Sequence, residues 1–452
     1  MNKKVLVVGF SVTGAACAKY LSGKYDVYLT DSAEQKPEDA PAIDELKLLN
    51  VKFEFGSHSD EFIKDSSFAI ISPSIPRDAL ILKKLEALGI EYFSDIEFCA
   101  RETAGKKSTG IILITGTNGK TTTTLLTSHI FETNFNAPAC GNVGVSPVEY
   151  LNSDPNYLVT EVSSYQLNYS KELKPKIAIF TNLTPDHLSW HGGLEEYFEA
   201  KAAVFKRMDK TCHAILNFDD ETVRKLSCEL KTNVHFFALD KAALDTVEGN
   251  AYIDCGAIFY SGEKIIDVKD VPIVGNHNLQ NVMCSVIAAK IAGIKTDDIT
   301  GAIKTFKAPA HRCEFIRMLD DTAYYNDSKA TNPEASIVAI NSFEGKKVVL
   351  IAGGRDKNTS LGEFIKSVKE RISKVVLIGE ATERFMDELY NSGYTNIVHA
   401  QSLEEAIDLA SLDKPDVVLL SPACASFDMF KNYEERGEAF RRYVLSKKQL
   451  VS

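Results

Sequence analysis

The residues with the clearest chemical meaning lie at positions 111–126, which read IILITGTNGKTTTTLL. An apolar, β-branched run leads into a glycine-rich loop that ends in Lys120 and several threonines. This order is typical of a phosphate-binding strand, loop and helix, in which backbone N–H groups and the helix start face an anion and the lysine adds positive charge. The loop is shorter than a full Walker motif, because Ile114 stands where the first glycine would be. A plain turn would leave Lys120 unexplained, so we predict phosphate binding at residues 116–121.

Two further side chains with suitable chemistry follow strands near this loop. Residues 157–162 read as a strand that carries Glu161, and an acidic residue at a strand end beside a phosphate loop is where a Mg²⁺ ligand belongs. Residues 177–181 read as another strand, which leads through NLTPD to His187. This histidine serves either as a capping or core residue or as part of the site. Its place after a parallel strand favours a role in the site.

Lys201 stands out because it lies among apolar residues of an expected helix. Residues 195–208 have the composition and period of a helix. Its apolar stripe of Phe198, Ala202 and Phe205 includes the position of this lysine. A buried ammonium is costly, so the side chain either reaches the surface along its apolar stem or is neutralised or paired, for example as a carbamate next to Mg²⁺. The sequence leaves these two alternatives open.

Polar loops also follow three short apolar runs in the last third of the chain, at residues 326–333, 353–357 and 421–428. Loops at the strand ends of one sheet converge, so their side chains are candidates for one cleft. The candidates are Asp327, Lys329, Lys357 and Ser426. Before these loops, GNHNLQN opens a helix expected over 282–291. Its Asn278 and Asn281 lie one turn apart, suited either to a polar ligand edge or to plain N-capping.

The start of the chain has the pattern of a Rossmann-type βαβ unit. Residues 5–8 read as a buried strand, GFSVTG follows, and a second strand over 26–30 ends at Asp31. Ser11 replaces the middle glycine of the dinucleotide fingerprint, which puts NAD in doubt but still allows a nucleotide diphosphate. A third strand over 68–71 ends in the rigid loop SPSIP. The first residues also imitate a signal peptide, but a strand and a glycine turn explain them better.

Composition limits the class of protein. The chain has 452 residues, of which 44% are hydrophobic and 25% charged, as expected for a globular protein too long for one core. A net charge of −11 without basic runs argues against nucleic acid as a partner. The 9 scattered cysteines lack a CxxC pair, which indicates reduced thiols in the cytoplasm. No segment approaches the ~18 apolar residues that span a bilayer, so membrane insertion is not expected.

These patterns predict an α/β protein of three domains. A Rossmann-like domain over 1–105 precedes a central domain over 106–308 of P-loop ATPase type, with a parallel sheet and a small β portion. Short β-like runs alternate with turns in the central domain, at 214–217, 235–239 and 257–260. A Rossmann-like domain with a parallel sheet is expected over 309–452.

The motifs together resemble those of the Mur ligases, over essentially the whole chain. The following occur in the order seen in that family: TGTNGKTT, GNVG, EVSSYQL, NLTPDHLSWHG, the Lys201 helix, GNHNLQN, AHRCEF, NDSKATNP, GGRDK and SPACASFDMFKNYEERG. Three of them point to the branch that adds D-glutamate: SPACASFDMF, SSYQL and NDSKATNP. The resemblance implies a monomeric cytoplasmic enzyme of peptidoglycan precursor synthesis.

The same resemblance implies a reaction. ATP would phosphorylate the terminal carboxylate of UDP-N-acetylmuramoyl-L-alanine, and the amine of D-glutamate would attack the acyl phosphate. Two Mg²⁺ ions and a CO₂-derived carbamate on Lys201 would assist. Phosphoryl transfer to a carboxylate brings two anions together, so the site must supply positive charge and alignment.

The resemblance also assigns residues. Expected catalytic residues are Lys120, Glu161, His187 and Lys201. Expected metal ligands are Thr121, Glu161, His187 and Lys201. ATP is expected at Gly116, Thr117, Asn118, Gly119, Lys120, Thr121, Thr122, Asn281, Arg312 and Asp327. The UDP substrate is expected at Val12, Thr13, Ser32, Ser72, Asn142, Gln166 and His187. D-Glutamate is expected at Lys329, Thr331, Lys357, Ser426 and Tyr433.

Two positions depart from the family pattern. Ser189 stands where the family usually has Asp, and the segment at Ser32 and Ala33 lacks the Arg that some members carry. Three alternatives therefore remain. They are another Mur ligase or a folylpolyglutamate synthase-like ligase with a different amino acid, an NAD-dependent oxidoreductase, and a nucleotide-gated binding protein without ligation chemistry.

Overall fold

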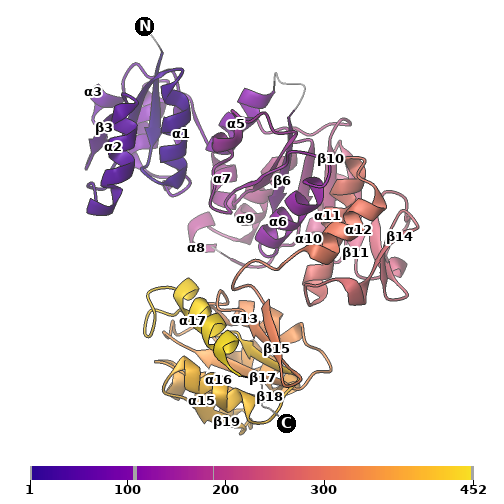
Figure 1. The fold of residues 1–452 in the computed structure, drawn as a ribbon. Helices are drawn as coiled ribbons and strands as arrows, with labels where there is room; N and C mark the ends of the chain where they lie inside the picture. Colours follow the sequence, from indigo (N-terminus) through magenta and orange to yellow (C-terminus); the bar gives the residue numbers. More distant parts are fainter. Residues whose placement is uncertain (1–2, 105–108, 187, 449–452) are drawn as a thin grey trace. The chain divides into compact units, whose positions relative to one another are not determined.

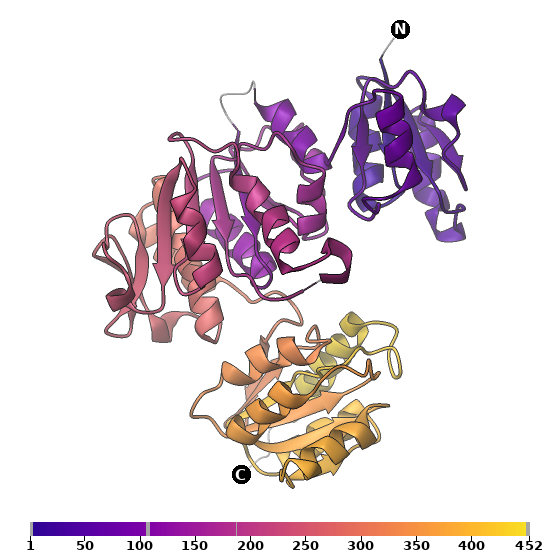
Figure 2. The same cartoon turned by 180° about the vertical axis from the view of Figure 1, so that it is seen from behind.

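The computed structural model describes residues 3–104, 109–186 and 188–448, without the side chains of residues 188 and 189. Within these ranges the strands form three sheets, and each sheet packs with helices in its own α/β domain (Figure 1 and Figure 2). This arrangement confirms the predicted three-domain α/β architecture.

The N-terminal domain has an all-parallel sheet with the strand order β3-β2-β1-β4-β5. Its strands are β1 (Lys4–Val8), β2 (Asp26–Asp31), β3 (Lys52–Phe55), β4 (Ala69–Ile71) and β5 (Tyr92–Phe93). Its helices are α1 (Val12–Ser22), α2 (Ala40–Leu48), α3 (Asp60–Ile63) and α4 (Leu80–Ala87). α5 (Asp95–Thr103) follows β5 and bonds to the central domain, where Ser146 Oγ donates to Asp95 Oδ2 (2.8 Å). Alternate residues of β1 serve opposite faces, with Val5 and Val7 packed toward α1, and Leu6 and Val8 toward α3 and α4. The predicted Rossmann-like unit is confirmed.

The central domain has a mixed sheet in the order β14-β13-β12-β11-β10-β9-β6-β8-β7, parallel from β7 to β12 and antiparallel beyond. Its strands are β6 (Gly110–Thr115), β7 (Ala139–Gly141), β8 (Tyr157–Glu161), β9 (Ile177–Phe180), β10 (His213–Asn217), β11 (Asn233–Ala238), β12 (Ala251–Asp254), β13 (Ala257–Tyr260) and β14 (Glu263–Asp267). The predicted parallel sheet with a small β portion is confirmed, although β12 and β14 were not among the predicted runs.

The helices that accompany this sheet are α6 (Lys120–Phe131), α7 (Ser164–Asn168), α8 (Leu188–His191), α9 (Leu194–Ala202), α10 (Glu221–Lys225), α11 (Asn276–Ile291) and α12 (Thr296–Thr305). Two helix predictions were wrong at their ends. After α9 the chain tightens into a 3₁₀ turn over Ala203–Phe205, so the helix does not reach residue 208. α11 begins before residue 282, and in its first turn the backbone N–H groups of Asn278 (2.9 Å) and Leu279 (3.1 Å) donate to the carbonyl oxygen of Gly275.

The C-terminal domain has the sheet order β15-β16-β20-β17-β18-β19. Its strands are β15 (Glu314–Leu319), β16 (Thr322–Asn326), β17 (Val348–Gly353), β18 (Ile372–Ile378), β19 (Ile397–His399) and β20 (Val417–Leu420). Helices α13 (Pro333–Asn341), α14 (Gly362–Arg371) and α15 (Thr382–Asn391) pack on one face. Helices α16 (Leu403–Ser411) and α17 (Tyr433–Ser446) pack on the other.

This third sheet is mixed, so the prediction of a parallel sheet was wrong at one edge. β15 runs antiparallel to β16, while the other pairs are parallel. The cause is a tight hairpin at Asp320 and Asp321, whose φ angles are 47° and 63°. Positive φ at both central residues is the geometry of a two-residue hairpin turn, and aspartate tolerates it.

Contacts group the described chain into two compact units. One holds the chain up to Val268 together with Gln280–Ile303, and the other holds Lys269–Leu279 and the chain from Lys304 onward. The predicted domain boundaries at residues 105 and 308 stay predictions. No helix in the described ranges is long and apolar enough to cross a membrane.

Candidate active site

The phosphate loop lies between β6 and α6, as predicted. Gly119 precedes α6 with a φ of 84°, and a Cβ there would lie 2.5 Å from the Oδ1 atom of Asn281, so the position favours glycine. Lys120 folds back over the loop, where its Nζ donates to the carbonyl oxygens of Gly116 (3.0 Å) and Thr117 (2.8 Å). The start of a helix and an ammonium group thus meet at one loop, which is an anion-binding arrangement.

The start of the NLTPD segment holds this loop in place, a contact that the sequence did not predict. The backbone N–H groups of Thr117 and Asn118 donate to Asn182, at its carbonyl oxygen and its Oδ1 atom respectively (both 2.9 Å). Thr181 Oγ1 donates to the carbonyl oxygen of Asn118 (2.6 Å). β9 pairs with β6 in parallel, so the end of β9 lies beside the loop. The polar residues after the predicted strand at 177–181 were the available signal.

Glu161 ends β8, the strand beside β6, and its side chain is 2% exposed. Asn142 Nδ2 donates to Glu161 Oε1 (2.8 Å). The other oxygen, Oε2, is buried and has no hydrogen-bond partner among the described residues. Buried carboxylate oxygens are normally paired, so this one is suited to a bound cation. Carboxylate oxygen is a preferred ligand of Mg²⁺.

Lys201 is 1% exposed, so the alternative in which its side chain reaches the surface is wrong. Its Nζ donates to the Gly116 carbonyl oxygen (2.7 Å), which also accepts from Lys120, and lies 4.5 Å from the centroid of the Tyr197 ring. Burial, and next the charge of Lys120, lower the pKa of Lys201 well below its usual value, while the carboxylates of Asp186 and Glu161 act in the opposite direction.

The structure therefore brings three of the predicted catalytic residues, Lys120, Glu161 and Lys201, close together. The fourth, His187, lies outside the described residues. Thr121 and Thr122 are in the first turn of α6, as predicted. Asn281 lies behind the loop, where its Oδ1 accepts a hydrogen bond from Thr123 (3.1 Å).

The glycine loop of the N-terminal domain is arranged differently from a dinucleotide site. Ser11 caps α1 by accepting from the N–H of Gly14 (3.2 Å), and its Oγ lies 3.1 Å from Ser72 Oγ. The carboxylate of Asp31, where a dinucleotide site binds the ribose, accepts from the backbone N–H groups of Phe10 (2.6 Å) and Ala33 (2.8 Å). Asp31 therefore ties the end of β2 to the glycine loop, and a ribose contact would share its oxygens with these backbone groups.

The structure brings three of the predicted UDP-binding residues, Val12, Thr13 and Ser72, to this loop. Val12 is largely exposed at the start of α1 and is followed by Thr13. Ser72 is joined to the loop through Ser11. Ser32 follows β2 on the exposed surface. Val12, Thr13 and Ser72 therefore lie at the N-terminus of α1, which favours an anion.

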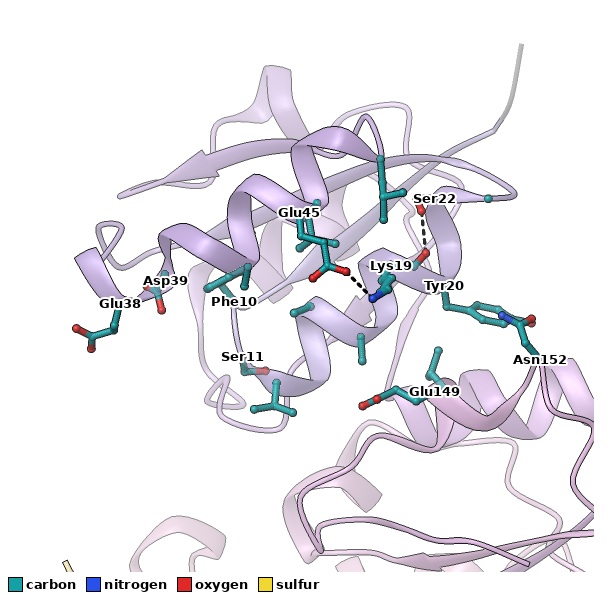
Figure 3. Close-up of a pocket in the computed structure, with 18 residues that line it drawn as sticks. Phe10, Ser11, Lys19, Tyr20, Ser22, Glu38, Asp39, Glu45, Glu149 and Asn152 are labelled. Atoms are coloured by element: carbon teal, nitrogen blue, oxygen red, sulfur yellow. Dashed lines mark hydrogen bonds and ion pairs between the residues drawn. The ribbon is translucent and has the colours of Figure 1, made fainter. Parts of the chain in front are cut away.

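A cavity of about 950 Å³ lies beside the same loop, between α1, α2 and the segment around Glu149 (Figure 3). Lys19 on its wall pairs with Glu45 at 2.5 Å. Further carboxylates on the wall belong to Glu38, Asp39 and Glu149. Phe10, Ser11 and Val12 of the glycine loop also line this cavity, so its wall combines the start of α1 with several carboxylates.

Gln166 and Asn142, both predicted at the muramoyl part of the substrate, make bonds within the protein. Gln166 is buried in α7 and closes a capping box with Ser163, whose N–H donates to Gln166 Oε1 (3.0 Å). Asn142 holds Glu161, as described above. Their roles toward the substrate stay predictions.

In the C-terminal domain, Arg312 and Asp327 lie close together, as expected of two residues at one ligand. The N–H of Cys313 donates to Asp327 Oδ1 (3.0 Å), and Ser421 Oγ donates to Asp327 Oδ2 (2.7 Å). Burial raises the pKa of Asp327 to about 7, although Ser421 and the charge of Arg312 act in the opposite direction. Both carboxylate oxygens of Asp327 thus accept hydrogen bonds within the protein, and a ribose hydroxyl would bind to the same oxygens.

The predicted D-glutamate residues come from loops that contact one another. Lys357 Nζ donates to the carbonyl oxygen of Thr331 (3.3 Å). Lys329 Nζ lies 5.1 Å from the centroid of the Tyr433 ring. Ser426 is buried in the third loop. The loops therefore share one region of the domain, while the role of each side chain stays a prediction.

Arg436 on α17 joins two of these loops and was missed by the sequence reasoning. It is 1% exposed, and burial lowers its pKa to about 10. Its Nε donates to Ser328 Oγ (3.0 Å), and its Nη2 donates to the carbonyl oxygens of Ser328 (2.8 Å) and Cys424 (3.1 Å). The guanidinium thereby fixes the loop of Lys329 to the loop of Ser426. Its position in the motif KNYEERG was the one feature of the sequence from which a role for Arg436 could have been predicted.

Three family models match successive parts of the chain. A Mur ligase MurD-like N-terminal domain matches residues 3–94, a Mur ligase middle domain matches 114–289, and a Mur ligase glutamate ligase domain matches 311–424. The UDP-N-acetylmuramoylalanine--D-glutamate ligase of Thermoanaerobacter pseudethanolicus is 38% identical to this chain, with 98% of each covered. The enzyme of the same name from Clostridioides difficile is 34% identical, also with 98% of each covered.

Solved structures with the same fold are more distant in sequence. A UDP-N-acetylmuramate-alanine ligase from Thermotoga maritima is similar with a TM-score of 0.57 and 18% identity, over 98% of this chain and 100% of that one. A pseudomurein peptide ligase type C from Methanothermus fervidus is similar with a TM-score of 0.57 and 19% identity, over 99% and 100%. At such identities the likeness establishes the fold alone.

Proposed function

The chain belongs to the Mur ligase family, and we propose that it joins D-glutamate to UDP-N-acetylmuramoyl-L-alanine with conversion of ATP to ADP and phosphate. The observation that carries this proposal is the end-to-end similarity to D-glutamate ligases, at 38% identity over 98% of both chains. A match to the MurD-like N-terminal domain supports the same branch of the family. By family membership we also propose a cytoplasmic, monomeric enzyme.

The geometry around the phosphate loop suits activation of a carboxylate. Lys120 and the start of α6 would supply positive charge where two anions must meet. An oxygen of the substrate carboxylate would then bond to the terminal phosphorus of ATP as the bond to ADP breaks. The amine of D-glutamate would next form the amide at the acyl carbon, while phosphate leaves and the amine gives up a proton.

We propose that magnesium binds in the same site, with two ions as the expected number. Thr121, Glu161, His187 and Lys201 in its carbamate form would be the ligands. The buried Oε2 of Glu161, which has no hydrogen-bond partner among the described residues, fits this role. A bound magnesium ion would neutralise charge on the phosphates.

The surroundings of Lys201 support carbamylation. Its amine is buried and its pKa is lowered, which favours the neutral form that attacks CO₂. Attack by the neutral amine would form an N–C bond and release one proton, so a neutral group would become an anion. Two amines now donate to the Gly116 carbonyl oxygen, at 2.7 and 3.0 Å. The negative charge of the carbamate would instead be attracted to the ammonium group of Lys120.

The remaining roles are proposed by family membership together with the placements described above. Asn281, Arg312 and Asp327 would contact ATP. The UDP substrate would bind Val12, Thr13, Ser32, Ser72, Asn142 and Gln166. D-Glutamate would bind Lys329, Thr331, Lys357, Ser426 and Tyr433.

Phosphate release tests the proposal. The purified enzyme is given ATP, Mg²⁺ and UDP-N-acetylmuramoyl-L-alanine, and then each candidate amino acid in turn. D-Glutamate should stimulate release, with L-glutamate and L-lysine as controls. Stimulation by another amino acid alone would assign a different Mur ligase, and no stimulation by any would favour a binding protein.

A further inference from the structure

The loop that carries Lys357 is held by an ion pair from a helix outside the predicted site. Arg384 on α15 (Figure 1) donates from Nε to Asp356 Oδ2 (2.7 Å) and from Nη2 to Asp356 Oδ1 (3.0 Å). The two side chains are 29% and 15% exposed, so the pair is partly shielded from water. Two parallel bonds of this kind fix the orientation of a carboxylate as well as its position.

Asp356 in turn shapes the backbone around Lys357. The N–H of Asn358 donates to Asp356 Oδ1 (2.8 Å), and Asn358 has a φ of 53°, a left-handed conformation that this turn stabilises. Arg384 Nη2 also donates to the carbonyl oxygen of Thr359 (3.1 Å). One guanidinium therefore holds the chain on both sides of Lys357.

The beginning of the same loop is fixed by other means. The N–H of Gly353 donates to the carbonyl oxygen of Pro422 (2.8 Å), and the N–H of Arg355 donates to that of Ala425 (2.8 Å). Loss of the Arg384 guanidinium would therefore loosen residues 356–359 and leave the strand end and the Ser426 loop in place.

We propose that Arg384 is a positioning residue for the D-glutamate subsite, which acts by holding Asp356 and through it Lys357. The inference rests on the proposed function, in which Lys357 binds D-glutamate. A dicarboxylate is recognised by ammonium groups at fixed places, so an unsupported Lys357 binds it more weakly.

The test compares Arg384→Ala with Arg371→Ala in the full-length enzyme. Arg371 is a matched control, because its side chain is 30% exposed and its Nη1 lies 3.5 Å from Glu344 Oε1. It lies at the opposite end of α14 from the loop. Arg384→Ala should raise the KM for D-glutamate about tenfold, the scale of one charge-assisted hydrogen-bonded pair. The KM values for ATP and the UDP substrate should match those of Arg371→Ala.

Further variants separate positioning from a merely structural role. Arg384→Lys keeps the charge but lacks the fork, so its KM for D-glutamate should be intermediate. Asp356→Asn should raise that KM by a similar factor, and the double variant should be no worse than either, because both residues act on one path.

An unchanged KM for D-glutamate overturns the inference, and so does an equal rise in all three KM values. If Arg384→Ala does not fold, the KM of Arg384→Lys for D-glutamate decides in the same way: an unchanged value overturns the inference. Absence of D-glutamate-dependent phosphate release in the wild type refutes the proposed function itself, and the inference falls with it. Wild-type activity with an unaffected Arg384→Ala refutes the inference alone.

Discussion

Replacement of Lys201 by methionine should change how the stability of the central domain depends on pH. Lys201 is 1% exposed, and burial together with the charge of Lys120 lowers its pKa well below the usual 10.5. The folded state therefore binds fewer protons than the unfolded chain. The stability that this implies is fully present above about pH 10.5 and is lost as the pH falls below it. Methionine is of similar length and carries no titrating proton.

The magnitude follows from one proton. A difference of one bound proton changes the free energy of unfolding by about 1.4 kcal/mol per pH unit. When the pH rises from about 8.5 to about 9.5, the free energy of unfolding of the wild type should increase by that amount relative to Lys201→Met. With a urea dependence of roughly 2 kcal/mol per molar, the midpoints should separate by about 0.7 M.

The single tryptophan of the chain supplies the assay. Trp190 lies on α8, and its ring centroid is 4.5 Å from that of Tyr165, so its fluorescence reports on the central domain. Urea titrations are run at both pH values in CO₂-free buffer with EDTA. Lys290→Met is the control, because Lys290 is 14% exposed but has a carboxylate oxygen of Glu263 at 2.7 Å. Equal pH dependence of the free energy of unfolding in the wild type and Lys201→Met would refute the reasoning. So would a Lys290→Met variant whose pH dependence differs from the wild type by as much as that of Lys201→Met.

Three further predictions concern single side chains. Lys120→Ala should weaken ATP binding by about 1.5–3 kcal/mol in calorimetry, through loss of a charged hydrogen bond to phosphate, and unchanged affinity would contradict the assigned role. Gly354→Ala should destabilise the C-terminal domain by about 1–3 kcal/mol in urea, because the residue has a φ of 132° and a Cβ would lie 2.3 Å from the Ala425 carbonyl oxygen. Burial raises the pKa of Asp327 from 3.8 to about 7, so its stabilising contribution is full below about pH 4 and is lost as the pH rises through 7. In Asp327→Asn the free energy of unfolding of the C-terminal domain should therefore depend less on pH between about pH 4 and 7 than in the wild type, as followed by circular dichroism. The same pH dependence in both proteins would contradict this prediction.

The parts of the site that lie within one stretch of chain were predictable. The phosphate loop is such a case, because strand, loop, Lys120 and helix are neighbours in sequence as well as in space. The support from Asn182 was missed, since it depends on which strand lies beside β6. Arg436 was missed for a similar reason. An arginine on an amphipathic helix is normally exposed, and its burial among carbonyl oxygens arises only when two distant loops meet.

Lys201 and the Asp320–Asp321 hairpin show what pattern alone could not decide. The apolar stripe placed Lys201 on the inner face, but whether its amine reached water depended on the depth of packing above α9. In the hairpin, two aspartates adopt positive φ without the glycine that usually marks such a turn. The alternation of strands and helices therefore favoured a parallel edge where the sheet is antiparallel.

The central claim is that ATP activates the substrate carboxylate at the loop of Lys120, and oxygen transfer tests it most directly. UDP-N-acetylmuramoyl-L-alanine is labelled with oxygen-18 in both oxygens of its terminal carboxylate and converted in the presence of ATP and D-glutamate. The released phosphate is then analysed by mass spectrometry. The account predicts one heavy oxygen in each phosphate, because that oxygen bonds to phosphorus before the amide forms. Amide formation with unlabelled phosphate would contradict it.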